Sequence, residues 1–365
     1  MRLLILAALT AAATAPAFSQ TEDTLEFSGL DWSVSGSPMP GTYQGREALR
    51  LHRSQIALAD APSDRFMVEY DLAMESGNGF SGILFRVQEN NGELVYLRHH
   101  LSGQPDALQY TPVVNGLTGW QIYASEGFWG TARFPVGDWI RVRLIVDGQQ
   151  ARLSLDGQPV LDIPELIGET DSGELILRGF GQTGSWIANL EISTLSDDGL
   201  PNMEAAPAPE IDGYLIDRWR VSGAFDEALV ANETRLPEGL PEDRTSLAAE
   251  HHGIANLARV ATLAEGADTV LAEADIQSDD DRVVILRFGY SDRVRVFLNG
   301  ELLFAGSNNW RSRDYRYLGT ISRDYAVPLR LRAGTNRLTL AVSENFGGWG
   351  VTGVLENSAG LNTTP

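Results

Sequence analysis

Apolar and polar residues alternate with a period of two through most of the first half of this chain, and this pattern limits the fold more than any other feature. The clearest example is RFMVEYDLAM, residues 65–74, and WIRVRLIVDG at 139–148 and ARLSLDG at 151–157 repeat the pattern. Asp147-Gly148 and Asp156-Gly157 stand at the ends of such runs and are typical of tight turns. Because no helical pattern intervenes between residues 22 and 193, the sequence predicts an antiparallel β-sandwich or jelly roll.

The same alternation returns in the second half of the chain. It is strongest in RVRVFLNGELLFAG, residues 293–306, where Asn299-Gly300 is typical of a two-residue hairpin turn. LRAGTNRLTLAVSE, residues 331–344, repeats the pattern. A helix-compatible stretch is expected over residues 245–264. The second half is therefore predicted to form a second β-sandwich.

The length of the chain favours two domains, because 365 residues exceed what one ordinary core holds. The segment SDDGLPNMEAAPAPE is rich in proline and acidic residues and has no apolar period, which is typical of a linker. The prediction is an all-β protein with two β-sandwich (jelly-roll) domains joined by a Pro-rich acidic linker. The expected bounds are a signal peptide at 1–19, a first domain at 20–195, the linker at 196–211 and a second domain at 212–365.

The first residues, MRLLILAALTAAATAPAFSQ, predict export. Arg2 is followed by an apolar run at 3–15, which is shorter than the ~20 residues that cross a membrane. Ala17 and Ser19 are small residues placed for cleavage before Gln20. No later segment is long and apolar enough to span a membrane. The chain is therefore expected to be secreted or periplasmic in a bacterium, and without cysteine it has neither a disulfide nor a thiol nucleophile.

The charge of the chain argues against nucleic acid as a partner. The formal net charge is −21 and the pI is about 4.6. Binding to a phosphate backbone depends mainly on positive charge that displaces counterions, so an acidic chain repels it.

Two pairs of segments resemble known families. FSGILFRVQENNGELVYLRHH at 80–100, followed by FPVGDWIRVRLIVDGQQARLSLDGQPVL at 134–161, resembles concanavalin A-like lectin/glucanase domains of the LamG-like and 3-keto-disaccharide hydrolase-like branches. RVRVFLNGELLFAGSNN at 293–309, with LRLRAGTNRLTLAVSENFGGWG at 329–350, resembles the galactose-binding-like jelly roll that accompanies many glycosidases. Both resemblances imply carbohydrate recognition.

One candidate site lies in the segment YLRHHLSGQPDALQYTPVVNGLTGWQIY, residues 96–123. If this segment begins as a strand, Arg98 and His100 share one face and His99 takes the other. The resemblance implies a ligand on one concave sheet, whose polar residues on the side away from the core would line the site. The predicted ligand-binding residues are Arg98, His100, Gln109, Tyr110 and Trp120. The alternative is a hydrogen-bonded scaffold with one buried histidine.

A second candidate site lies in SNNWRSRDYRYLG, residues 307–319. Its aromatic rings suit the C–H faces of sugars, and its arginines can donate paired hydrogen bonds to hydroxyls or to the carboxylate of an anionic glycan. ENFGGWG, residues 344–350, adds a further tryptophan on a glycine-rich loop. The predicted residues are Asn309, Trp310, Arg311, Arg313, Tyr315 and Trp349. The alternative is a structural loop that closes one end of the sandwich.

No metal ligands and no cofactor are predicted, because adjacent histidines on a strand point to opposite faces and cannot share one ion. A structural calcium ion is compatible with both families, and the acidic run 279–281 is a candidate that also suits a solvated turn. EYDLAME, residues 69–75, invites comparison with family-16-type glucanases, but its third acidic residue, Glu75, comes late.

These observations predict a secreted carbohydrate-binding protein that recognises a glycan or oligosaccharide through aromatic and Arg-rich sites on both sandwiches. One alternative is a glycoside hydrolase with its active site in the first domain. The other alternative is an interaction module with a partner protein in the cell envelope.

Overall fold

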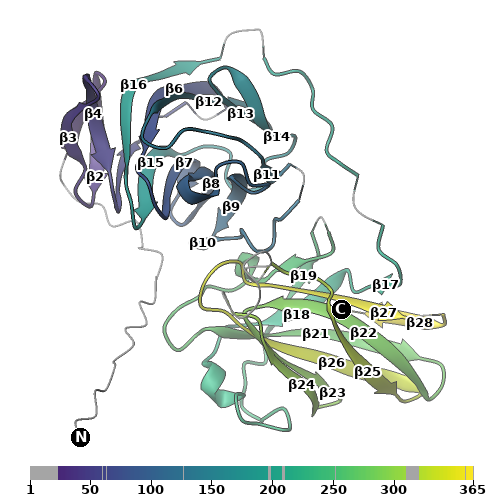
Figure 1. Ribbon diagram of the computed structural model, residues 1–365. Helices are drawn as coiled ribbons and strands as arrows, with labels where there is room; N and C mark the ends of the chain where they lie inside the picture. The colour runs from purple at the N-terminus through teal and green to yellow at the C-terminus, as the bar shows by residue number, and fades with distance from the viewer. Residues whose placement is uncertain are drawn as a thin grey trace, which may run out of the picture.

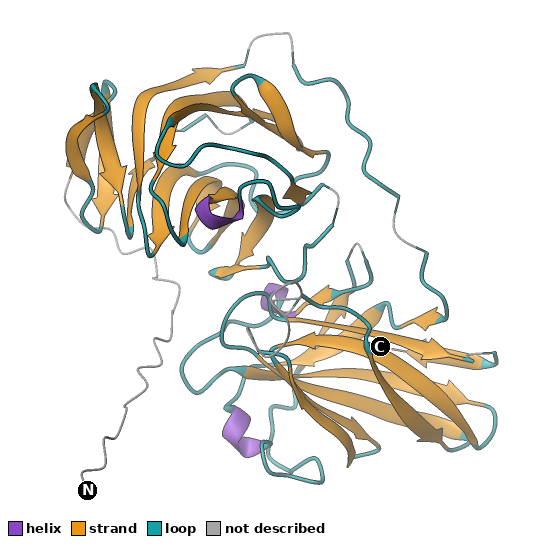
Figure 2. Cartoon of the chain, in the orientation of Figure 1, coloured by secondary structure: helices purple, strands orange, loops and turns teal. Residues whose placement is uncertain are grey.

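The computed structural model describes residues 24–59, 61–62, 64–125, 127–195, 199–207, 210–250, 252–309, 320–357 and 359–364. Strands dominate these residues, and the helices drawn in Figure 2 are short turns. The strands form four antiparallel sheets, which we call sheets A to D. Sheets A and B are built from residues 24–194 and sheets C and D from residues 214–364, so each half of the described chain forms one β-sandwich (Figure 1). The predicted all-β fold class is thereby confirmed.

The N-terminal sandwich pairs sheet A with sheet B. Sheet A runs in the order β1 (Thr24–Phe27), β2 (Leu30–Ser35), β5 (Ser54–Leu58), β15 (Glu174–Gly181), β7 (Gly79–Gln88), β8 (Asn91–Arg98), β9 (Leu108–Val114), β10 (Leu117–Thr118), and β11 (Trp129–Gly130) also pairs with β9. Sheet B runs in the order β14 (Gln158–Ile163), β13 (Gln150–Leu155), β12 (Trp139–Asp147), β6 (Arg65–Met74), β16 (Ser185–Thr194), β4 (Arg46–Leu51), β3 (Met39–Tyr43).

The period-two alternation determines which side chains form the core between sheets A and B. On β6 the apolar set from Phe66 to Met74 is almost fully buried, and Leu144 on β12 is completely so. Asp156 and Gly157 both have positive φ at the turn between β13 and β14, as the turn sequence predicted. The strand pattern and the direction of the apolar side chains are therefore confirmed for these segments.

The C-terminal sandwich pairs sheet C with sheet D. Sheet C runs in the order β17 (Tyr214–Leu215), β27 (Gly350–Glu356), β22 (Arg282–Ser291), β25 (Tyr325–Leu331), and β20 (Ala255–Asn256) also pairs with β27. Sheet D runs in the order β19 (Arg244–Ala248), β18 (Arg218–Ser222), β21 (Thr269–Ser278), β26 (Gly334–Ser343), β23 (Arg293–Leu298), β24 (Glu301–Ser307), and β28 (Leu361–Thr364) also pairs with β21.

Two sequence predictions have different outcomes in this sandwich. Asn299 and Gly300 both have positive φ and join β23 to β24, so the predicted hairpin is confirmed. The helix expected over 245–264 is wrong, because these residues contain strands β19 and β20 and the 3₁₀ turn η3 (Leu257–Arg259). β19 pairs along its whole length with β18, and this tertiary pairing overrides the local preference for a helix.

The two sandwiches touch through the segment at 115–125. Ile122 and Tyr123 pack in the same apolar cluster as Ile254 and Ile321 of the C-terminal half. The Tyr123 hydroxyl donates a 2.5 Å hydrogen bond to Glu250. Residues 199–207 contain no helix or strand, and the domain bounds given above stay predictions. None of the helices in the described residues has the length and apolar character needed to span a membrane.

Candidate functional site

The outer face of sheet A, which points away from the core, gathers aromatic and hydrogen-bonding side chains into rows. Strand register places Phe180, Phe80 and Arg98 side by side across β15, β7 and β8. The adjacent row, across five strands, consists of Gln55, Arg178, Gly82, Tyr96 and Gln109. These side chains come from segments far apart in the sequence. Because they stand on paired strands, their spacing is set by the rigid sheet.

Aromatic rings form the centre of this face. Phe80 and Phe180 are stacked, with ring centroids 4.7 Å apart and an angle of 7° between the planes. The His100 ring meets Phe80 edge-on at 5.4 Å, and Tyr96 lies tilted against both phenylalanines. Phe80 and Phe180 are half-buried and His100 is exposed, so part of this aromatic group is open to solvent.

Arg98 is held in a closed network beside these rings. Its guanidinium donates a 2.6 Å hydrogen bond to Asp106 and a 3.0 Å hydrogen bond to the Tyr96 hydroxyl, and it also bonds to Gln109. The Gln109 amide donates in turn to the backbone carbonyls of Trp120 and Tyr123. Arg98 and Gln109 are buried, so this network orients the site and offers little surface to a ligand.

Arg178 is arranged differently. Its guanidinium carbon lies 4.6 Å from the centroid of the Phe180 ring, and its side chain is half-buried. Burial lowers the pKa of this guanidinium, although the group stays charged at neutral pH. Its stem packs across Gly82, where an added Cβ would lie 3.3 Å from the Arg178 Cγ. Arg178 makes no ion pair or hydrogen bond with any residue that the structure describes, in contrast to Arg98.

The two histidines have different surroundings, and they do not lie on a strand as the sequence predicts. The strand ends at Arg98, and His99 and His100 belong to the 3₁₀ turn η1 (His99–Leu101). His99 is buried and hydrogen-bonded at 2.9 Å to Ser81, and burial lowers the pKa of its ring to about 4. Desolvation and the nearby charge of Arg98 lower the pKa of His100, so its ring is neutral at pH 7 and can donate or accept a hydrogen bond.

Two of the predicted residues in this segment do not face the site. Tyr110 is fully buried in the core between the sheets, where its hydroxyl donates a 2.9 Å hydrogen bond to Glu93. Because Gln109 faces outward on the same strand, the period of two turns Tyr110 inward, away from any ligand on the outer face. The ring of Trp120 is turned toward Phe346 of the C-terminal sandwich, at a centroid distance of 6.1 Å. Only its backbone carbonyl contacts the site, through Gln109.

Part of the second predicted site lies outside the described residues. The residues not described are Trp310, Arg311, Arg313 and Tyr315, and their role in ligand binding stays a prediction. Asn309 is half-buried, and its side chain accepts a 3.0 Å hydrogen bond from Ser307. Trp349 is completely buried in the C-terminal core, and its indole donates to the Val342 carbonyl, so a surface ligand cannot reach its ring.

The acidic residues compared with family-16-type glucanases face away from the core of sheet B and are engaged by arginines. Glu69 pairs with Arg143 at 2.8 Å, and Asp71 pairs with Arg141 at 3.3 Å. Glu75 pairs with Arg50, whose hydrogen bond lowers the pKa of that carboxyl. Because these carboxylates are held as ion-pair partners, none of the three is placed to donate a proton to a leaving group.

A buried pair of acids in the C-terminal sandwich was not predicted. Asp292 and Glu344 are 1% and 0% exposed, and burial raises the pKa of both carboxyls. The nearby charge of Asp292 raises the pKa of Glu344 further. Gln121 reaches this cluster from the N-terminal sandwich and accepts a 2.7 Å hydrogen bond from the Gly348 N–H. Within the described residues, no group of three or more His, Cys, Asp or Glu side chains is placed to hold a metal ion.

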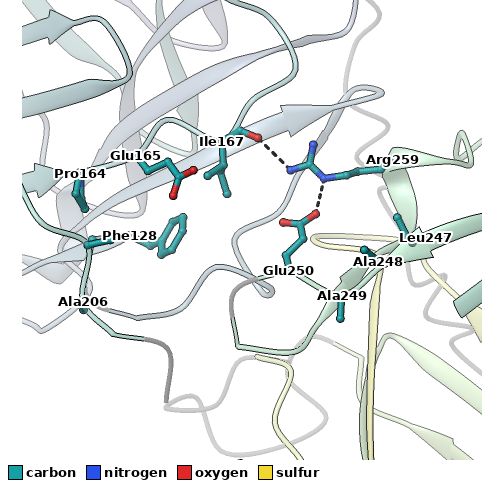
Figure 3. Close-up of a pocket in the computed structure, with 12 residues that line it drawn as sticks. Phe128, Pro164, Glu165, Ile167, Ala206, Leu247, Ala248, Ala249, Glu250 and Arg259 are labelled. Carbon is teal, nitrogen blue, oxygen red and sulfur yellow. Dashed lines mark hydrogen bonds and ion pairs between the residues drawn. The ribbon is translucent and has the colours of Figure 1, made fainter. Parts of the chain in front are cut away.

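A pocket of about 400 Å³ opens between the two sandwiches (Figure 3). Figure 3 shows Phe128 and Ile167 on one side and Leu247 to Glu250 on the other. Arg259 bonds to Glu250 and donates a 3.0 Å hydrogen bond to the Ile167 carbonyl, so it is already satisfied within the protein. The pocket thus offers mainly apolar surface, and the outer face of sheet A is the better candidate for a polar ligand.

Sequence reasoning missed four residues of this face, namely Phe80, Tyr96, Arg178 and Phe180. The signal was present in ELILRGFG, residues 174–181, where Arg178 interrupts an otherwise apolar strand. That signal shows which residues share a face of one strand, but only the strand order brings β15 next to β7.

No protein-family model and no curated protein sequence matches this chain. Among solved structures, the carbohydrate-binding module CBM66 from Bacillus subtilis matches with 18% identity and a TM-score of 0.35, over 45% of this chain and 95% of the module. A Bacillus subtilis protein of unknown function with a galectin-like fold matches with 12% identity and a TM-score of 0.33, over 45% of this chain and 89% of its own.

A galectin from Caenorhabditis elegans matches with 13% identity and a TM-score of 0.29, over 38% of this chain and 89% of the galectin. At these identities and TM-scores the matches do not support a function for this chain. The β-sandwich assignment rests on the four sheets that the described residues of the chain itself form.

Proposed function

We propose that this protein is a secreted or periplasmic glycan-binding protein whose ligand lies on the outer face of sheet A. The observation that carries the proposal is the combination, on one rigid sheet, of a solvent-accessible aromatic pair with an arginine that makes no ion pair or hydrogen bond among the described residues. Sugars present C–H faces to aromatic rings and hydroxyls to hydrogen-bonding side chains, and such a face supplies both. Phe80, Phe180, Arg178 and His100 would contact the ligand. Arg98 and Gln109 would hold the surrounding network in place.

Recognition is favoured over hydrolysis by the state of the acidic residues. Hydrolysis of a glycoside ordinarily uses two carboxyls, one of which donates a proton. Beside sheet A, Asp106 is committed to Arg98, and Asp71 and Glu69 of sheet B are paired with arginines as well. The glycoside hydrolase alternative therefore has less support than binding.

The test is a glycan-array experiment on the chain from residue 20 onward, with Phe80→Ala and His100→Ala beside the wild type. We expect the wild type to bind a defined set of glycans and both variants to lose at least about tenfold in affinity, because stacking and hydrogen bonds in a shared site each contribute on the order of 1–2 kcal/mol.

Val283→Ala is the control, since Val283 is 54% exposed and lies on β22 of the C-terminal sandwich. It should bind like the wild type. If the wild type binds no glycan, or if the sheet A variants bind as well as the wild type, the proposed function is wrong.

A further inference from the structure

Arg178 stands apart from the arginines around it because its charge is not compensated by the described residues. Arg98 is paired with Asp106 at 2.6 Å, whereas the pKa of Arg178 is lowered by burial alone. Removing a guanidinium from water without an anionic partner is unfavourable, so partly buried arginines in proteins are usually paired. The arrangement at Arg178 therefore costs stability in the ligand-free protein.

The geometry holds this unpaired charge in one orientation. The guanidinium lies over the Phe180 ring, and Phe180 is itself stacked with Phe80. Gly82 leaves space for the stem, since an added Cβ would lie only 3.1 Å from Leu94 and 3.3 Å from the Arg178 Cγ. The N–H groups of a guanidinium lie in its own plane, at the edge of the group, so a guanidinium whose face contacts a ring can still bind a planar anion through that edge.

The neighbouring groups on this face do not supply such an anion. Asp106 is bonded to Arg98, and His100 is neutral at pH 7. The other members of the row with Arg178 are Gln55, Gly82, Tyr96 and Gln109, which carry no negative charge at that pH. A ligand that brings its own negative charge would complete the set.

We propose that the glycan bound on sheet A is acidic and that a carboxylate of one of its sugar units, as in a uronic acid, pairs with the guanidinium of Arg178. This inference rests on the proposed function and adds the chemical class of the ligand. Carboxylate is the anion that matches the planar fork of arginine with two parallel hydrogen bonds. Phe80, beside it, would contact the ring of the same sugar or the next one.

The test is calorimetric titration of the chain from residue 20 onward with oligogalacturonates and alginate oligosaccharides, each compared with its fully methyl-esterified form. The methyl ester keeps the sugar ring and removes the charge. We expect the acid form to bind about 10- to 100-fold more tightly than its ester, which is the range expected for a hydrogen-bonded charge pair. The preference should shrink as salt is raised.

Arg178→Gln should remove this preference while the ester binds as before, and Arg178→Lys should restore part of it, since it returns the charge without the fork. Arg218→Gln is the control, because Arg218 is exposed on the C-terminal sandwich. This variant should prefer the acid over the ester as strongly as the wild type does.

Thermal unfolding without ligand gives a second, independent measurement. Among the described residues Arg178 has no ion pair to lose, and its contact with the Phe180 ring contributes only weakly to stability. Because its uncompensated burial costs stability, Arg178→Gln should unfold at the same temperature as the wild type or a higher one.

The outcomes separate the two proposals. If neutral sugars or esters bind as tightly as acids, and Phe80→Ala removes that binding, the proposed function stands and the acidic ligand is wrong. If Arg178→Gln weakens acid and ester equally or lowers the unfolding temperature, Arg178 is structural and the inference is overturned. If no sugar of either kind binds, both proposals fall.

Discussion

Arg98 and Arg178 lie on the same face of sheet A and show how a side chain's partners determine its role. Arg98 donates to Asp106, Tyr96 and Gln109, so its charge and most of its N–H groups are used inside the protein. Arg178 contacts the face of Phe180 and keeps its N–H groups available. Arg98 therefore stabilises the surface, and Arg178 is the group that would contact a ligand.

Glu93 gives a residue-scale prediction about pH. This carboxyl is 1% exposed, and burial raises its pKa from 4.5 to about 7, partly offset by hydrogen bonds from Tyr110 and the Gly168 N–H. A raised pKa means that the folded state binds the proton more tightly than the unfolded chain. The stability that this proton contributes is present below pH 4.5 and is lost as the pH rises through about 7.

We therefore expect Glu93→Gln, which mimics the protonated form, to gain about 3 kcal/mol relative to the wild type between pH 5 and pH 8. Urea unfolding at several pH values measures this difference. Leu97→Ala on the same strand is the control, because its packing cost does not depend on a proton. A difference between Glu93→Gln and wild type that stays constant over this range would refute the prediction.

At the scale of secondary-structure elements, the period of two and the turn residues determine where most strands lie and which of their faces is buried. On β12, Val142 and Leu144 are buried, whereas Arg141 and Arg143 on the other side pair with Glu69 across β6. The exception is the stretch at 245–264, where the sequence predicts a helix and the structure contains β19. There β19 pairs along its whole length with β18, and this tertiary pairing outweighs the local preference for a helix.

The hairpin between β23 and β24 gives a prediction at this scale. Gly300 has a φ of +82°, and an added Cβ would meet nothing within 4 Å, so the cost of a side chain there is purely conformational. Gly300→Ala should lower the free energy of unfolding by about 1 kcal/mol. Gly223→Ala should be neutral or slightly stabilising, because at Gly223 the nearest atom to a Cβ is 3.9 Å away and φ lies outside the left-handed region.

Chemical unfolding of the two glycine variants beside the wild type measures the difference. An equal effect of both substitutions would mean that the backbone conformation of the Asn299-Gly300 turn does not contribute to stability as the structure indicates.

At the scale of the whole molecule, contacts between the sandwiches decide whether they behave as one unit. Arg259 bonds to Glu250 within its own sandwich and reaches Glu169 at 3.2 Å and the Ile167 carbonyl at 3.0 Å in the other. The Tyr123 hydroxyl, which belongs to the N-terminal sandwich, donates a hydrogen bond to the same Glu250. This polar network lies along the wall of the pocket in Figure 3, so the pocket depends on the relative placement of the two sandwiches.

Arg259→Ala should weaken this coupling by about 2–3 kcal/mol, because it leaves Glu250 without its cation and the Ile167 carbonyl without a donor. Scanning calorimetry should then resolve two separate transitions, or a wider gap between them than in the wild type. Arg235→Ala is the matched control, since the Arg235–Glu301 pair is 79% and 67% exposed and lies within one sandwich. It should leave the profile unchanged. A single unchanged transition in Arg259→Ala would show that the sandwiches are held together by other contacts.

The sequence alone determined the local features of this protein, because they depend on neighbours along the chain. Alternation gave the strands and their buried faces, and Asn299-Gly300 and Asp156-Gly157 gave two turns. The ligand-binding roles predicted for Arg98, His100 and Gln109 stay predictions; the structure places Arg98 on β8, His100 in the turn that follows it and Gln109 on β9.

The assembly of the candidate site was decided by tertiary structure. Phe180 and Phe80 are a hundred residues apart in the printed sequence, and they stack because β15 inserts between β5 and β7 in sheet A. The same strand order leaves Arg178 beside Gly82 and away from any described carboxyl, while Trp349 and Tyr110 are drawn into cores by packing. Which residues meet across a sheet depends on strand order and register, and both are set by the free energy of the whole fold rather than by any local pattern.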